Sequence, residues 1–141
     1  MNALNFLDAN VWMALLWEGH IHSERAQQWF QRVEDEQFLF CRFTQITTLR
    51  LLTTAAVMGK DVCTMIRAWK LWDIVESDRN VSFLPEPDGL DHEFRDRSKL
   101  SVHPPKVWAD AYLLAFASVA GVRLVTFDRG LASRKAEVLL L

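Results

Sequence analysis

Apolar residues along this chain form short continuous runs, separated by longer stretches in which they recur every three or four positions. The continuous runs cover residues 4–7, 38–41, 81–84, 122–127 and 138–141. Since a strand covered on both faces has no need of polar positions, such runs predict buried strands. Strands that alternate with helical stretches are typical of a layered α/β fold with a mostly parallel sheet.

The stretches between these runs have the apolar spacing of helices. Helices are predicted over residues 9–17, 23–36, 45–57, 63–76, 90–98 and 107–120. Asn10 and Thr44 are the predicted N-caps of the first and third helices, because their side-chain oxygens can accept a hydrogen bond from an unpaired amide. Residues 59–61 form a predicted turn, and prolines mark loops at residues 85–89 and 103–106.

The helical spacing also predicts which side chains are buried and which meet a partner. In the third helix, the buried side should contain Ile46, Leu49, Leu52, Thr53 and Ala56. In the fourth helix, an apolar group is a candidate for a dimer or partner groove: Trp69, Leu71, Trp72 and Val75.

Residues 107–131 organise the predicted fold. Their first part is a helix that is apolar on nearly all sides and therefore buried. Gly121 ends this helix, because glycine adopts a left-handed cap without steric cost. The strand at 122–127 follows, and Asp128 comes directly after it, with at most two helical turns over residues 128–133.

Three aspartates occupy positions at which α/β proteins bind ligands. Asp8 follows the first strand as Asp128 follows the fourth, and Asp110 lies in the first turn of the predicted buried helix. Ligands of open α/β sheets bind at the carboxyl ends of the strands, and a helix N-terminus favours a carboxylate. The three acids are therefore predicted to converge on one divalent cation, which prefers oxygen ligands. Each acid is also explained as the cap of the turn or helix that it begins.

Length, charge and cysteine content narrow the class of protein. With 141 residues, the chain is predicted to form a single domain, residues 1–141. The net charge of −2 gives no sign of a nucleic-acid surface, but a bound metal would change the local field and leave a nucleic-acid substrate open. Cys41 and Cys63 are read as reduced core thiols. Asp8 interrupts the apolar N-terminal run and no run is long enough to cross a membrane, so a cytoplasmic protein is expected.

Several common kinds of site are absent from the sequence. None of the four histidines pairs with a cysteine at the spacing of a zinc site: His20, His22, His92 and His103. The nucleophile elbow of hydrolases, the Walker loop and the dinucleotide-binding glycine motif do not occur either.

Three segments carry a resemblance to a known family. They are residues 7–11 (LDANV), 108–113 (WADAYL) and 125–131 (VTFDRGL). Together they resemble the PIN-domain nucleases, and within them the VapC-type toxins of bacterial toxin–antitoxin modules. The resemblance implies a single PIN-like domain with a three-layer fold. It also implies a Mg²⁺- or Mn²⁺-dependent endoribonuclease that cleaves RNA by phosphodiester hydrolysis, a cognate VapB-type antitoxin and a homodimer.

The resemblance assigns the catalytic metal ligands to Asp8, Asp110 and Asp128. Asp8 and Asp110 would hold the cation, and Asp128 would hold it through water or bind a second cation. A cation in this position lowers the pKa of a bound water and neutralises charge on the phosphate.

Four further side chains flank these acids in the sequence. Asn10 is a candidate for orienting Asp8 or a water molecule, and Thr126 for a hydrogen bond to an aspartate, although capping and strand propensity explain both residues as well. Arg129 and Lys106 are candidate contacts to RNA phosphates, with solvated surface charge as the alternative.

One position departs from the family pattern. The family has a glutamate in the helix after the second strand, where this chain has Thr47 within an acid-free segment, residues 43–53. Three possibilities remain open: a subgroup that works with three aspartates, which the segment favours; a degenerate site; or a replacement acid from Asp88, Asp91 or Glu93.

Two alternative functions therefore stand beside the toxin ribonuclease. Thr47 motivates a PIN-fold RNA- or protein-binding module with a degenerate metal site. Three aspartates around Mg²⁺ would also suit a phosphatase-like hydrolase of small substrates.

Overall fold

The computed structural model describes residues 3–33, 35–101, 104–132 and 137–141. Within these residues lies one five-stranded sheet, in which every pair of neighbouring strands is parallel and the order is β3-β2-β1-β4-β5. The strands are β1 (Leu4–Leu7), β2 (Gln37–Phe40), β3 (Val81–Phe83), β4 (Arg123–Thr126) and β5 (Val138–Leu140). Each continuous apolar run of the sequence thus forms a strand, as predicted.

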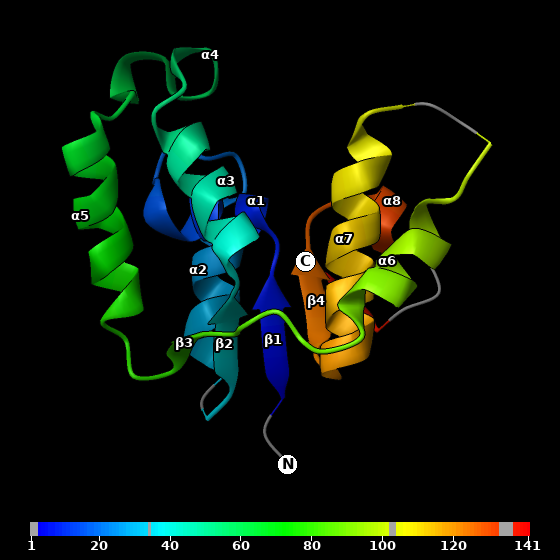
Figure 1. Cartoon of the computed structure of the whole chain (residues 1–141). Coiled ribbons are helices and arrows are strands. Elements are labelled where there is room, and N and C mark those ends of the chain that lie inside the picture. Colours follow the sequence, from blue (N-terminus) through cyan, green and yellow to red (C-terminus); the bar gives the residue numbers. More distant parts are fainter. Residues whose placement is uncertain (1–2, 34, 102–103, 133–136) are drawn as a thin grey trace.

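Helices cover both faces of the sheet, which gives the predicted three layers (Figure 1). One group of helices follows β1 and β2: α1 (Ala9–Leu16), α2 (Ser23–Arg32), α3 (Arg42–Leu52), α4 (Ala55–Met58), a 3₁₀ turn (Gly59–Asp61) and α5 (Met65–Glu76). The other group follows β3 and β4: α6 (Leu90–Ser98), α7 (Lys106–Ala120) and α8 (Arg129–Ala132). None of the helices in the described segments has the length and apolar character needed to cross a membrane.

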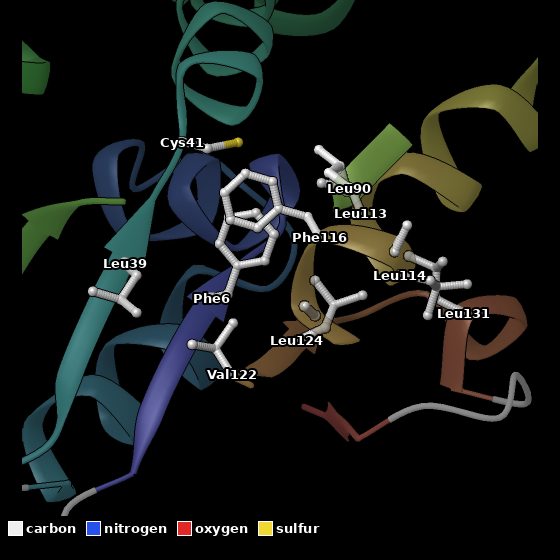
Figure 2. Close-up of a cluster of buried hydrophobic side chains, with 12 residues drawn as sticks. Phe6, Leu39, Cys41, Leu90, Leu113, Leu114, Phe116, Val122, Leu124 and Leu131 are labelled. Atoms are coloured by element: carbon white, nitrogen blue, oxygen red, sulfur yellow. The ribbon is translucent and has the colours of Figure 1, made fainter. Parts of the chain in front are cut away.

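Alternate residues of the strands supply two separate cores. Phe6 and Leu124 point toward α7, where the Phe6 and Phe116 rings stack with centroids 4.7 Å apart (Figure 2). Successive residues of a strand face opposite ways, so the next residue along each strand packs on the opposite layer. There Trp12 of α1 lies against Phe40 and Trp72, with ring centroids 6.3 and 5.5 Å away. The two cores hold the ends of β1 and β4 in fixed relation to α1 and α7.

Trp72 is fully buried in this second core, so its predicted place in a partner groove is wrong. Its indole N–H donates to Glu76 at 3.0 Å, within the same helix. Trp69, by contrast, is 46% exposed on α5. Leu71 and Val75 are partly buried and pack against the cores.

Helix α3 differs from its prediction in both bounds and face. It begins at Arg42, because Thr44 Oγ1 accepts the Cys41 amide in a capping box, and Thr44 is therefore not the N-cap. It ends at Leu52, where the hydroxyls of Thr53 and Thr54 bond back to helix carbonyls and α4 starts separately.

The buried face of α3 is largely polar, although Leu52 is buried and Leu49 packs against the core as the sequence predicted. It contains Thr44, Gln45, Thr48 and Leu52. Ile46 is 55% exposed, and Ala56 lies exposed on α4. The hydroxyls of Thr44 and Thr48 donate to carbonyls of the preceding turn, so their burial leaves no donor unpaired.

Other predicted bounds need smaller corrections. Helix α2 ends at Arg32 rather than at residue 36, and α5 begins two residues late because Thr64 caps it, accepting the Arg67 amide at 3.2 Å. Cys41 is buried as predicted, Cys63 is only partly buried, and both are free thiols. His103 and Ser133, which belong to a predicted loop and turn, lie outside the described residues.

Candidate functional site

The strand order places two of the predicted acids at one edge of the sheet. β1 and β4 are parallel neighbours, with Leu7 paired to Val125. Asp8 continues the ladder by donating its amide to the Val125 carbonyl at 2.9 Å. Asp8 and Asp128 therefore both follow the carboxyl ends of adjacent central strands, where α/β sheets bind ligands.

A cavity of about 320 Å³ opens at this edge, and we call it the aspartate pocket. It collects the three predicted carboxylates with further polar side chains from α1, α3 and α7: Asp8, Asn10, Thr47, Arg50, Lys106, Asp110 and Asp128. Asp8 thus lines the same pocket as Asp110 and Asp128, which lie more than 100 positions later in the sequence. Arg50 was not singled out from the sequence, because nothing local distinguishes it from a solvated helix residue.

Asp8 is fixed by two hydrogen bonds. Its Oδ1 accepts the Ala9 amide at 2.7 Å, which makes Asp8 the N-cap of α1, and its Oδ2 accepts the Thr126 hydroxyl at 3.0 Å. Burial raises the pKa of Asp8, the two hydrogen bonds oppose that rise, and the nearby charges of Asp110 and Asp128 add to it. A carboxylate held in this way keeps one orientation toward the pocket.

Asn10 is therefore not the cap that the sequence predicted. It lies exposed within the first turn of α1, and its side chain lines the pocket. Asp8 and Asn10 are both residue types that cap helices, and the cap falls on Asp8 because β1 ends there.

Thr126 ties the two strand ends together. Its hydroxyl donates to Asp8 and accepts the Asp128 amide, each at 3.0 Å, and the residue is fully buried. The predicted hydrogen bond from Thr126 to an aspartate is thus present. It orients Asp8 and the backbone that carries Asp128 with one side chain.

Asp110 projects from the second turn of α7 and not from the first, because the helix begins at Lys106. The favourable effect of the helix N-terminus is accordingly smaller than predicted, since it fades beyond the first turn. The ammonium of Lys106 lies 3.3 Å from Asp110 Oδ2 and also contacts Asp128 Oδ2. The hydrogen bond from Lys106 holds the pKa of Asp128 below its ordinary value, and the amide of Gly130 acts in the same direction.

The pocket has the donor atoms that a divalent cation requires. In the part of the chain that is described, no three acidic, histidine or cysteine side chains are close enough to form a ready metal cluster. The Lys106 ammonium, however, is shared by Asp110 and Asp128, so these two carboxylates already hold one cation between them. Asp8 adds a third carboxylate to the same wall. Carboxylate oxygens fit a hard ion such as Mg²⁺ or Mn²⁺.

Thr47 lines the pocket but brings no charge to it. Its hydroxyl donates to the Phe43 carbonyl at 2.8 Å, one turn earlier in α3. None of the three acids considered as replacements is among the residues that line the pocket: Asp88, Asp91 and Glu93. Asp91 is paired with Arg95 on α6 at 2.8 Å. The pocket therefore has three carboxylates.

A second hollow of about 370 Å³ continues from the aspartate pocket, and Asn10 and Asp128 line both. Its far wall contains His20, His22 and Phe127, and the His22 ring stacks on Phe127 at 4.3 Å. We call it the histidine hollow. The one feature of the sequence that could have indicated this hollow is the position of Phe127, an aromatic residue directly before Asp128.

Arg129 is exposed at the first residue of α8 and lines neither hollow. Its predicted contact with RNA stays a prediction.

Comparisons with known proteins show the family and the fold. Residues 6–137 match the family model of the PIN domain. The chain is 39% identical to Ribonuclease VapC41 of Mycobacterium tuberculosis over 126 residues, 86% of each chain. It is 32% identical to Ribonuclease VapC44 of the same organism over 136 residues, 89% of this chain and 87% of the relative.

Two solved structures share the fold. VapBC2 from Rickettsia felis, bound to a DNA fragment from its promoter, superposes with a TM-score of 0.66 at 8% identity, over 97% of this chain and 98% of that one. VapC20 of Mycobacterium tuberculosis, described as a Sarcin-Ricin loop cleaving toxin, superposes with a TM-score of 0.64 at 16% identity, over 92% and 93% of the two chains.

Proposed function

The chain belongs to the PIN-domain family, and from this premise we propose that it is a VapC-type toxin, an endoribonuclease that a VapB-type antitoxin neutralises. Relatives that align along most of the chain are ribonucleases named VapC. The observation that carries the proposal is the meeting of Asp8, Asp110 and Asp128 in one pocket at the carboxyl edge of the sheet. The reaction is hydrolysis of a phosphodiester bond of RNA.

Asp8, Asp110 and Asp128 are the residues that would hold Mg²⁺ or Mn²⁺. When bound, the cation supplies an activated water and neutralises charge that develops on the phosphate. Thr126 and the Ala9 amide keep Asp8 in one orientation, so it binds without rearranging. The whole chain, residues 1–141, is proposed to act as one domain.

The basic side chains of the pocket bind the substrate. A phosphate that approaches three carboxylates is repelled, and positive charge beside them offsets that repulsion. Arg50 and Lys106 both line the pocket wall and are placed to contact phosphate oxygens. Beyond them, the histidine hollow extends the cleft past Asp128. A cleft that continues in this way suits a polymer better than the small substrate of a phosphatase.

A non-catalytic binding module remains the second candidate, and Thr47 is the observation that favours it. An uncharged residue at the fourth acid position weakens the attraction for a metal. In our proposal, three carboxylates suffice, since phosphate oxygens complete the ligand set when RNA binds.

Partner contacts are proposed for the surface between α3 and α5. Ile46, Met65 and Trp69 are exposed there and line a hollow of about 360 Å³. Clustered exposed apolar side chains mark protein interfaces, so we place the antitoxin or the second copy of a homodimer on this surface. We also propose a cytoplasmic location, which suits the two free thiols.

Cleavage of total RNA by the purified protein tests the function. We expect cleavage with Mg²⁺ or Mn²⁺, none with EDTA, and a loss of more than about tenfold in Asp8→Asn and Asp110→Asn. Asp91→Asn, which removes an exposed carboxylate of α6, is the matched control and should retain full activity. Binding of RNA without cleavage under all these conditions would favour the binding module instead.

A further inference from the structure

Lys106 brings a positive charge directly onto two of the proposed metal ligands. Its ammonium lies 3.3 Å from Asp110 Oδ2, one helical turn away, and it also contacts Asp128 Oδ2, which follows β4. The lysine thus bridges α7 and the end of β4 through one cation. A metal ion that used the same two oxygens would lie close to this ammonium and be repelled by it.

We propose that Lys106 is a built-in counter-ion of the aspartate pocket, which a divalent cation must displace in order to bind Asp110 and Asp128. This inference rests on the proposed function, in which these aspartates hold the metal. Three carboxylates in one pocket repel each other, and the ammonium reduces that repulsion in the metal-free protein. The ammonium and a metal ion held at the same carboxylate oxygens repel each other, so the two cations compete.

The exposure of the three side chains allows such an exchange. The Lys106 side chain is 65% exposed, whereas the side chains of Asp110 and Asp128 are only 16% and 28% exposed. The lysine is anchored by its backbone at the start of α7, and its flexible stem can turn the ammonium into water. Since ion pairs this exposed are weak, the metal displaces the lysine at little cost. Lys106 therefore lowers metal affinity without abolishing it.

The displaced ammonium also connects metal binding to RNA binding. Once released from Asp110 and Asp128, it remains on the wall of the pocket and can pair with a phosphate oxygen. A phosphate that holds the lysine removes the competitor of the metal. Because linkage is reciprocal, RNA should tighten metal binding, and metal should tighten RNA binding, through this one side chain.

Calorimetric titration with Mn²⁺ alone, without RNA, tests the inference on the full chain. Lys106→Met keeps the aliphatic stem but supplies neither charge nor an oxygen ligand, and we expect it to bind Mn²⁺ more tightly by on the order of tenfold. Lys106→Arg keeps the charge and should bind as the wild type does. Lys70→Met removes the same charge from an exposed position of α5, on the far side of α3 from α7 (Figure 1), and should also leave the affinity unchanged. Lys106→Ala is the second charge-removing variant if Lys106→Met does not fold.

Each other outcome overturns the inference in a recognisable way. Equal Mn²⁺ affinity of the wild type and the charge-removing variants would mean that Lys106 does not compete, and the proposed ribonuclease would stand. An equal gain in Lys70→Met would assign the effect to net charge alone. Absence of saturable Mn²⁺ binding by every variant would overturn this inference, whereas the proposed function would still be decided by the cleavage of RNA with and without EDTA.

Discussion

Replacement of Thr126 by valine is the sharpest test of how the site is held together. The substitution keeps the shape of the side chain and removes one hydroxyl, which donates to Asp8 and accepts the Asp128 amide, each at 3.0 Å. A hydrogen bond to a charged group contributes about 1.5–3 kcal/mol, and one between neutral groups about 0.5–1.5 kcal/mol. Because Thr126 is fully buried, water does not replace either bond. We therefore expect the free energy of unfolding to fall by about 3 kcal/mol.

Thr48→Val provides the matched control. Thr48 is equally buried, but its hydroxyl bonds only the Thr44 carbonyl of its own helix, at 2.7 Å. That carbonyl also lies within the helical ladder of α3, so the control should lose about 1 kcal/mol or less.

Urea unfolding followed by tryptophan fluorescence measures both variants, with EDTA present so that metal binding does not contribute. A Thr126→Val protein no less stable than Thr48→Val would refute the reasoning. It would mean that the hydroxyl does not connect the ends of β1 and β4 in solution.

Three further predictions follow from burial and ring contacts. Trp72→Ala should lose about 3–5 kcal/mol of stability in urea unfolding, whereas half-exposed Trp69→Ala should lose under about 1 kcal/mol; equal losses would contradict the assignment of faces on α5. Burial, together with the neighbouring His22, lowers the pKa of His20, so the unfolded chain binds a proton at this residue more readily than the folded chain. The free energy of unfolding should therefore fall as the pH drops from about 7 to about 5, and it should fall less in His20→Gln. Urea midpoints measured at both pH values test this. His22→Ala should weaken the binding of labelled single-stranded RNA by about fivefold in fluorescence anisotropy with EDTA present, while His92→Ala on α6 should not; equal effects would remove the histidine hollow from the RNA path.

Strands were predictable from the sequence because the central strands β1, β2 and β4 are buried by layers on both sides, while the edge strands β3 and β5 are partly exposed. A nearly unbroken apolar run as short as residues 122–127, with Gly121 directly before it, suits a buried strand better than a helix. The placement of Asp8 and Asp128 followed from the same runs, since each acid stands where a run stops. The resemblance of the segments around them to the PIN-domain nucleases is consistent with the family match.

Spacing predicted the burial of Leu52 but not the rest of the buried face of α3. Apolar residues such as Ile46 lie toward solvent there, while Thr44 and Thr48 are buried with their hydroxyls bonded to the helix itself. A prediction from periodicity uses apolar residues alone, so it misses a buried polar side chain that forms its hydrogen bond with the backbone of its own helix. A surface reserved for another protein chain gives the same misleading signal.

The ion pairs of Lys106 with Asp110 and Asp128 could not be predicted from the sequence either. They depend on where α7 begins, and prediction started that helix at residue 107, one position late. Boundaries of helices are their least predictable feature. Here one residue decides whether the lysine belongs to a loop or stands one turn before Asp110.

The position of β1 in the middle of the sheet has a consequence for synthesis. Its neighbour β4 is made long after it, since Asp8 and Thr126 are 118 positions apart in the sequence. While α1 to α7 are being synthesised, the nascent chain therefore contains Asp8 but lacks β4 and Asp128, which complete the aspartate pocket. In an enzyme that attacks RNA, this order means that the ribosome finishes most of the chain before the product can cut anything.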